Sequence, residues 1–375
     1  MEFLVFGEDW GRHPSSSQHI LQVISQDYDV HWINSIGLRQ PKIALRDLKR
    51  IWEKIRARAT PPRQVTPANT TPPATIIKPL VWPMAQHAIL KALNNYLLQK
   101  QLTEKKYRRV VWAALPSAID YLDICNSDLV IYYCGDDFSA LAGVDHQYAE
   151  MAEQRLAERA DIILACSPAL QRKFPKNKTF LLPHGVHLSH FAKPAIAPSD
   201  INLSRPSIGF YGSLNNWLDQ ALIVSLAHER PGIDFYFIGR QDTDISSLHK
   251  LDNIHILPVK PHHQLAGYLQ HWTVAILPFI DNDQIRACNP LKLREYIAAG
   301  CPVISSDFPA AKPYRSVLTT ATSKTQWLAA IDHYCQWSPS KRQNHSHQAQ
   351  AMVLNESWEN RSSQVIEIIK EKMHS

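Results

Sequence analysis

Several features that mark membrane-spanning and secreted proteins are missing from this sequence of 375 residues. It has no run of about eighteen consecutive apolar residues, so no transmembrane helix is expected. Its start, MEFLVFGEDWG, carries Glu2, Glu8 and Asp9 where a signal peptide would be basic and then apolar. We interpret this stretch as a first buried strand and expect a cytoplasmic protein.

The six cysteines include no C-x-x-C pair and stand mostly in apolar, strand-like or helical contexts. This pattern argues against both disulfides and zinc. We therefore expect reduced cysteines in or near the core.

Acidic residues are scarce in one part of the chain. Residues 39–109 contain sixteen Lys and Arg side chains and only three acidic ones, a net charge of +13, whereas the whole chain carries +6 and the remainder therefore −7. Aromatic residues such as Trp52, Trp82 and Tyr96 are interleaved with this charge, which favours peripheral attachment to an anionic inner membrane leaflet. A solvated helical face is the simpler alternative. Nucleic acid is not expected as a partner, because no recognised binding motif accompanies the charge.

Short apolar runs alternate with amphipathic helical stretches along nearly the whole chain. Runs such as EFLVFG, DLVIYYC, PSIGFYGS and VAILPF predict buried strands, and strands separated by helices predict parallel sheets. Residues 192–206 combine prolines and serines without periodicity and predict an interdomain linker. We predict two α/β domains, 1–191 and 207–355, followed by a helix over 356–375 that packs back on the first domain. A second proline-rich stretch, residues 60–75, predicts an exposed loop.

Two oppositely charged side chains stand one turn apart in the stretch NPLKLREYIAAG, residues 289–300. Lys292 and Glu295 share one face of a predicted helix, near the end that Pro290 helps to start. A lysine at the positive end of a helix can hold a diphosphate, and a carboxylate one turn deeper can accept hydrogen bonds from the hydroxyls of a ribose. Taken alone, however, this spacing is usually an ordinary surface ion pair.

Neighbouring residues make a nucleotide site the better interpretation. Two predicted strands end in residues suited to a bound ligand, namely Gly212, Ser213 and Arg240. Open α/β sheets bind ligands at the carboxyl ends of their strands, and glycine there lets the backbone come close to a ligand.

Residues 253–309 resemble the nucleotide-binding half of GT-B glycosyltransferases, in particular bacterial members similar to family 4. The shared pattern is a strand, a V-K-P-like turn, a helix, a strand ending in P-F, and then P-x-K-x-x-E-Y-x-A-x-G-x-P-V. Weaker agreement in GFYGSLNNWLD and LLPHGVHLSHF extends the resemblance to roughly half of the chain. The layout is similar to that of xanthan-type glucuronosyltransferases. The resemblance implies the GT-B fold, in which two Rossmann-like domains face a central cleft.

For the donor, the resemblance implies that Glu295 holds the ribose, that Lys292 holds the diphosphate, and that backbone near Val259 and Lys260 borders the base. The same motif brings in Asn289, Pro290 and Leu291.

The chain departs from the family pattern at three places. Many members carry two glutamates eight positions apart, but the earlier position here is Ala287. The Arg and Lys that often follow the GS loop are replaced by LNNWLD, so Arg286 is the candidate for the missing positive charge. The paired glycines of the usual first-domain loop are replaced by HPSSSQH.

In such an enzyme the first domain holds the acceptor. The stretch IYYCGDDF ends a predicted strand in Asp136 and Asp137, and a carboxylate there can accept the proton of a sugar hydroxyl. Asp137, or failing it Asp136, is the predicted base, while a helix cap is the structural alternative. If the base is used, transfer inverts the anomeric configuration. The loop after the first strand contributes the acceptor-side candidates Arg12, His13, Ser15, Ser16 and His19.

No metal or other cofactor is expected. No D-x-D motif stands at a predicted strand end in the manner of metal-dependent transferases, and basic residues can balance the diphosphate. His184 and His187 stand where relatives often have Asn and Asp, and we interpret them as hydrogen-bonding loop residues rather than metal ligands.

The sequence therefore predicts a glycosyltransferase of hexosyltransferase type that moves a sugar from a UDP- or GDP-linked donor to a lipid-linked or growing glycan, in cell-surface polysaccharide biosynthesis. A sugar-nucleotide epimerase and an inactive binding module are the alternatives, because they can share the fold. The sugar, the nucleotide, the acceptor, the stereochemistry of transfer (inverting or retaining) and the oligomeric state stay open at this point.

Overall fold

The computed structural model describes residues 1–11, 15–36, 73–79, 81, 88–138 and 145–374. The chain divides into two compact units, Met1–Pro183 with Ser362–Ser375, and His184–Arg361. The predicted border at residue 191 falls at the end of α6 (Leu188–Phe191), which belongs to the second unit because Val186 and Phe191 pack into that unit's core.

The first unit is built on a seven-stranded parallel sheet in the order β3-β2-β1-β4-β5-β6-β7. Fully buried apolar side chains such as Leu4, Val111 and Tyr132 form its core. Its strands are β1 (Glu2–Phe6), β2 (Asp29–Ile33), β3 (Thr75–Ile77), β4 (Arg109–Ala113), β5 (Leu129–Cys134), β6 (Ile162–Ala165) and β7 (Thr179–Leu181). Its described helices are α1 (Ser16–Ile24), α3 (Ala88–Gln99), α4 (His146–Arg159) and α5 (Pro168–Gln171), with 3-10 turns over Pro116–Ile124 and Lys176–Lys178.

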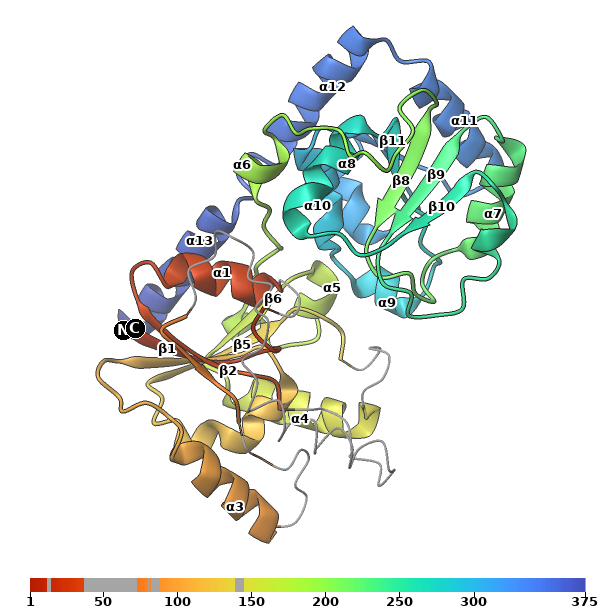
Figure 1. Ribbon diagram of the computed structural model, residues 1–375. Helices are drawn as coiled ribbons and strands as arrows, with labels where there is room; N and C mark the ends of the chain where they lie inside the picture. The colour runs from red at the N-terminus through yellow and green to blue at the C-terminus, as the bar shows by residue number, and fades with distance from the viewer. Residues whose placement is uncertain (12–14, 37–72, 80, 82–87, 139–144, 375) are drawn as a thin grey trace. The chain divides into compact units, whose positions relative to one another are not determined.

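The last helix, α13 (Trp358–His374), starts in the second unit, and its residues from Ser362 onward belong to the first. Figure 1 shows this part of α13 beside α1. The Ser362 hydroxyl donates a hydrogen bond to the Ile20 carbonyl of α1, at 3.1 Å.

The second unit is built on a six-stranded parallel sheet in the order β10-β9-β8-β11-β12-β13. The chain order reverses between β8 and β11, and such a switch point is where open α/β sheets bind ligands. The strands are β8 (Ser207–Tyr211), β9 (Asp234–Ile238), β10 (Ile254–Leu257), β11 (Val274–Leu277), β12 (Val303–Ser305) and β13 (Leu318–Thr320). Besides α6, the helices are α7 (Gln220–Glu229), α8 (Leu265–His271), α9 (Asp283–Ala287), α10 (Leu291–Ala298), α11 (Lys324–Cys335) and α12 (Pro339–Met352), and the 3-10 turns are Leu248–Lys250, His262–Gln264 and Pro309–Tyr314.

Helix α10 ends at Ala298, and Gly300 follows its C-cap, Ala299. This glycine adopts a left-handed backbone conformation with φ of 70°. The Gly300 amide then donates to the Ile297 carbonyl and the Cys301 amide to the Tyr296 carbonyl, at 2.9 and 3.1 Å. These two bonds form a Schellman motif, which satisfies carbonyls that the helix end would leave without partners.

The basic segment is only partly covered by the described residues. Nine of its sixteen cations lie within residues 37–72, outside the described ranges, as does most of the predicted loop over 60–75, whose last residue starts β3. Three of the other seven form ion pairs with carboxylates of the first unit, namely Arg109 with Glu2, Lys105 with Asp128 and Lys91 with Asp120. These three cations therefore contribute to the fold.

The cysteine prediction is confirmed. All six cysteines are free, four are buried, and Cys288 and Cys335 are half-buried.

Candidate functional site: Lys292 and Glu295 on α10

Lys292 packs over two aromatic rings at the switch point of the second sheet. Its ammonium nitrogen lies 4.5 Å from the centre of the Phe210 ring and 5.9 Å from that of Phe279. Among the described residues, no carboxylate lies within the 4.0 Å ion-pair distance of this nitrogen. Burial lowers the pKa of Lys292 to about 8, although the negative charge of Glu295 acts in the opposite direction. A partly dehydrated ammonium held in this way is a binding group for an anion.

Gly212 makes room for this lysine directly after β8. A Cβ atom at Gly212 would lie 2.2 Å from the Lys292 ammonium nitrogen, and the φ of 131° is one that residues with side chains rarely adopt. The backbone conformation therefore favours glycine here, and a side chain at this position would displace the Lys292 ammonium.

Glu295 lies one turn along α10 and is held on both carboxylate oxygens. The Tyr211 hydroxyl donates to Oε2, and the His262 Nε2 atom lies 2.7 Å from Oε1. Burial acts to raise the pKa of Glu295, but contact with His262 and Tyr211 and the charge of Lys292 leave it below its ordinary value. Burial likewise acts to lower the pKa of His262, and Glu295 raises it above the usual value. Glu295 is thus an anion with lone pairs left for further hydrogen bonds.

The other predicted cations of this site are already paired with carboxylates. Arg240 forms two hydrogen bonds with Asp242, at 2.6 and 2.9 Å, and Asp242 also accepts from the Ser213 hydroxyl. The ammonium group of Lys260 lies 2.5 Å from Asp200.

Arg286 is likewise paired and also exposed. It bonds both oxygens of Asp281, at 2.8 and 2.9 Å, and contacts Asp283 at 3.2 Å. Its side chain is 57% exposed. An anionic ligand would have to compete with these carboxylates for Arg286 or Arg240, but not for Lys292.

The remaining predicted donor residues lie around the start of α10 and the turn after β10. Asn289 is buried and accepts a hydrogen bond from Arg294 at 2.6 Å, which fixes the entry to the helix. Pro290 is the N-cap and Leu291 the first residue of α10. Val259 is 67% exposed, so its side chain is accessible to a ligand.

Histidines gather beside Glu295. The His190 ring stacks on that of His262, with centres 5.7 Å apart, and the His187 ring lies edge-on at 6.5 Å. His184 is buried, and its pKa is lowered to about 3 by burial and by the charges of Arg294 and Arg361. Burial likewise lowers the pKa of His187, so the packing of both imidazoles within the protein favours their uncharged form.

No group of three or more His, Cys, Asp or Glu side chains in the described part of the chain is arranged to hold a metal ion. Metal independence stays a prediction.

In the first unit, Asp136 follows β5 and has like charges near it. Its side chain is exposed, yet loss of surrounding water and the negative charges of Glu8 and Asp137 raise the pKa of Asp136 to about 7. Exposure moderates the effect of dehydration, and the two carboxylates act in the same upward direction. Asp136 can therefore exchange a proton near neutral pH.

Asp137 has a different setting. The Lys173 ammonium lies 2.9 Å from Asp137 and 3.1 Å from the buried Glu153, which also accepts a hydrogen bond from Tyr132. Through Lys173, Asp137 is therefore linked to Glu153 on α4.

Three of the predicted acceptor-side residues lie in the described ranges. Ser15 is the N-cap of α1 and accepts from the Gln18 amide at 3.4 Å. Ser16 is buried and hydrogen-bonds the hydroxyl of Tyr133, three residues before Asp136. His19 is half-buried, and the remaining two, Arg12 and His13, lie outside the described residues.

Sequence reasoning missed Tyr211 and His262, the two partners of Glu295, and also Glu8 and Asp242. The tyrosine directly before the GS loop and the histidine pair in the turn KPHHQ were the available signals. Neither is distinctive without the register that brings them to α10.

Comparison with known proteins agrees with the two-unit α/β fold described above. No family model matches the chain. The Bacillus subtilis (strain 168) protein TuaH, provisionally named a glycosyltransferase of teichuronic acid biosynthesis, is 27% identical over 250 residues. The match covers 60% of this chain, which spans 63% of the length of that relative.

Solved structures extend the likeness to the whole chain. Sucrose-phosphate synthase from Thermosynechococcus elongatus superposes with a TM-score of 0.70 at 12% identity, covering 100% of both chains. Anabaena HepE in complex with UDP-glucose gives a TM-score of 0.68 at 13% identity, covering 99% of this chain and 100% of that one. The chain has the GT-B fold.

The predicted fold class is thereby confirmed. In GT-B terms, the unit that contains Lys292 and Glu295 is the second of two Rossmann-like units, and the first is the one that contains Asp136. The finer resemblance to family 4 and to xanthan-type enzymes stays a prediction.

Proposed function

We propose that this chain is a glycosyltransferase that moves a hexose from a UDP- or GDP-linked donor to a lipid-linked or growing glycan, in the biosynthesis of a cell-surface polysaccharide. The observation that carries the proposal is the Lys292 ammonium, packed on two rings and without a carboxylate partner among the described residues. A donor diphosphate supplies the charge that such an ammonium lacks. The similarity to TuaH and to structures holding UDP-glucose supports the choice of reaction and donor.

In this reaction Lys292 holds the diphosphate and Glu295 accepts hydrogen bonds from the ribose hydroxyls. Asp136 takes the proton of the acceptor hydroxyl as its oxygen bonds to the anomeric carbon. The bond from that carbon to the diphosphate breaks, and the nucleoside diphosphate leaves with both electrons. The anomeric configuration inverts, and no metal is needed because the positive charge of Lys292 faces the leaving group.

We prefer Asp136 to Asp137 as the base. Asp137 is held by Lys173 at 2.9 Å, and an ammonium in contact makes a carboxylate a weaker proton acceptor. The raised pKa of Asp136 is closer to what a general base requires.

An inactive GT-B binding module is the second candidate. It is favoured by Ala287, a buried alanine at the position where many similar chains carry the first of two glutamates. A binding module would bind the nucleotide sugar and turn over no acceptor.

The test is a thermal-shift and hydrolysis screen of the full chain against UDP- and GDP-sugars, with and without EDTA. A donor should stabilise the fold in proportion to occupancy. Slow hydrolysis of the same compound, unaffected by EDTA, is the expected result. Failure of every nucleotide sugar to stabilise the chain would refute the proposal, and loss of hydrolysis in EDTA would refute metal independence.

We further propose that α3 attaches the first unit to an anionic inner leaflet. Ile89, Leu93 and Tyr96 share one helical face and are 83%, 50% and 53% exposed. The Lys100 ammonium lies 4.4 Å from the centre of the Tyr96 ring, at the edge of that face. An apolar stripe flanked by lysine suits the interface of an anionic bilayer. In the described part of the chain, no helix is both long and apolar enough to cross a membrane.

Co-sedimentation with vesicles tests this attachment. Replacing the three exposed side chains by serine should abolish binding to vesicles rich in phosphatidylglycerol, whereas Met151→Ser, an equally exposed apolar position on α4, should not. Wild-type binding that is independent of anionic lipid and of salt would remove the membrane proposal.

A further inference from the structure

A cavity lies in the unit that carries Lys292, away from the switch point. Side chains from the segment around β13, from the end of α11 and from α12 line it, and its volume is about 420 Å³. Pockets of ~300–1,000 Å³ are typical of small-ligand sites. Strand β13 is the edge of the sheet, separated from β8 by β11 and β12, and none of the candidate donor residues lines the cavity.

The chemistry of the lining is that of a carbohydrate site. Trp337 is half-buried, and the rings of Tyr334 and His345 form T-shaped pairs with it, with centres 4.7 and 5.1 Å away. Asn344 and Gln348 are exposed and lie one turn apart on α12. Aromatic faces pack against the C–H faces of sugar rings, and side-chain amides both donate to and accept from hydroxyl groups.

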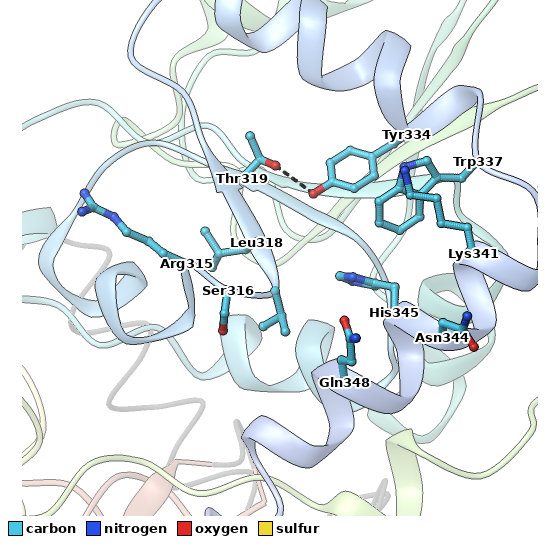
Figure 2. A pocket seen from close by; sticks show the side chains of 11 residues that line it. Arg315, Ser316, Leu318, Thr319, Tyr334, Trp337, Lys341, Asn344, His345 and Gln348 are labelled. Carbon is cyan, nitrogen blue, oxygen red and sulfur yellow. Dashed lines mark hydrogen bonds between the residues drawn. The ribbon is translucent and has the colours of Figure 1, made fainter.

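His345 supplies an independent sign of a missing partner. Its side chain is only 9% exposed, and its Nε2 atom is buried without a hydrogen-bond partner. Figure 2 shows the ring extending from α12 into the cavity, toward Leu318. The other ring nitrogen donates a hydrogen bond to the Cys301 carbonyl, and burial lowers the pKa of His345. The Nε2 atom is therefore left as an acceptor. Buried polar atoms without partners are rare, and a sugar hydroxyl can donate to this one.

The positive charge around the cavity favours an acidic sugar over a neutral one. The lining contains two cations, Arg315 and Lys341, and no acidic side chain among its described residues. Arg315 is paired with Asp307 at 2.8 Å and extends away from the cavity in Figure 2. The Lys341 ammonium lies 4.8 Å from the centre of the Trp337 ring, where a sugar stacked near that ring would place an acidic substituent.

We propose that this cavity is a second, non-catalytic carbohydrate site that binds an acidic glycan through a uronic acid residue. Trp337 stacks on the sugar ring, Lys341 pairs with the carboxylate, and His345 accepts a hydroxyl proton. Such a site holds a glycan chain on the enzyme without taking part in transfer, so it does not depend on the proposed reaction.

The test is calorimetric titration of the full chain with a short hyaluronan oligosaccharide, which contains glucuronic acid, and with a neutral chito-oligosaccharide of equal length. The acidic compound should bind more tightly. Trp337→Ala should weaken its binding about tenfold and Trp337→Phe should restore most of it, since a stacking contact is replaced by another. Lys341→Met should remove the preference for the acidic compound, whereas Lys324→Met, an exposed lysine at the other end of α11, should not.

The double variant Asn344→Ala/Gln348→Ala removes two exposed amides without disturbing the core and should also weaken binding. Saturating UDP should leave binding unchanged. Three results would each overturn the second site. They are absence of hyaluronan binding to the wild-type chain, wild-type affinity in both Trp337→Ala and Lys341→Met, and displacement of the oligosaccharide by UDP. None of these outcomes depends on transfer activity.

Discussion

The two carboxylates that we assign to the reaction lie in opposite electrostatic surroundings. Glu295, in the second unit, contacts the hydrogen-bond donors His262 and Tyr211, and Lys292 is one turn away. The pKa of Glu295 therefore lies below its ordinary value despite burial. Asp136, in the first unit, has the carboxylates Glu8 and Asp137 as neighbours, and its pKa is raised to about 7. One carboxylate is fixed as an anion, while the other can gain and lose a proton.

This difference follows from neighbours rather than from residue type. A group that binds hydroxyls must keep its lone pairs unprotonated, and a group that accepts a proton must have a pKa near the working pH. The second unit therefore places Glu295 beside hydrogen-bond donors and a cation, and the first unit places Asp136 beside two carboxylates.

The largest effect is expected from removing the proton acceptor. Asp136→Asn keeps the shape but cannot accept a proton, so the transfer rate should fall by about two to four orders of magnitude. Nucleotide affinity should be unchanged, because the nucleotide is held by the other unit. Asp137→Asn, at the lysine-paired position, should lose much less activity.

The same carboxylate predicts the pH profile. The base works only when deprotonated, so the wild-type rate should fall as the pH drops through about 7. Transfer assays across pH, with NMR of the product, check both points. Full activity of Asp136→Asn, or a retained anomeric configuration, would remove Asp136 from this role.

Next in size is the ribose contact of Glu295. Glu295→Ala should weaken UDP binding by ~1.5–3 kcal/mol, the cost of losing hydrogen bonds to a charged group. UDP lacking both ribose hydroxyls should bind the wild-type chain as weakly as UDP binds Glu295→Ala. The variant should bind the two ligands with the same affinity. Calorimetry of both ligands with both proteins closes this cycle. A variant that still prefers the ribose hydroxyls would assign them to another residue.

The smallest effect concerns stability. The pKa of His262 is raised above 6.5, so its contribution is present below that pH and is lost as the pH rises through the raised value. The pKa of Glu295 is lowered from 4.5, so its contribution is present above that pH and is lost as the pH falls through the lowered value. The pair should stabilise the fold most between pH 4.5 and 6.5.

Thermal unfolding of His262→Asn measures this window. For a loss of about 1 kcal/mol we expect a decrease in Tm of ~2–4 °C, largest inside the window and smaller above it. A decrease that is the same at every pH would mean that His262 acts through packing and not through charge.

The parts of this comparison that the sequence could predict are local. The one-turn spacing of Lys292 and Glu295 on α10 follows from helical periodicity. Short apolar runs predicted eleven of the described strands. The other two do not stand out as apolar runs, because β3 (TII) begins at the last residue of the proline-rich stretch and β13 (LTT) contains a single apolar residue.

The partners of the charged groups could not be predicted, because they come from distant parts of the chain. His262 and Tyr211 stand 33 and 84 residues from Glu295 in the sequence, and only the sheet order brings them together. By contrast, Asp281 and Asp283 stand only five and three residues from Arg286, so this pairing is local. The ring-packed Lys292, which has no carboxylate partner among the described residues, again depends on the sheet order that brings Phe210 to α10.

The contrast between these two cations gives the most direct test, which is calorimetric titration of UDP-glucose into the wild-type chain, Lys292→Met and Arg286→Met. We predict that Lys292→Met weakens UDP-glucose binding by ~1.5–3 kcal/mol. Arg286→Met should change it by less than ~1 kcal/mol, because Arg286 is exposed and already paired. Binding an anion favours the protonated lysine, so wild-type affinity should also fall as the pH rises through about 8, and this dependence should vanish in Lys292→Met. Unchanged affinity in Lys292→Met, or a larger loss in Arg286→Met, would contradict a donor site centred on Lys292.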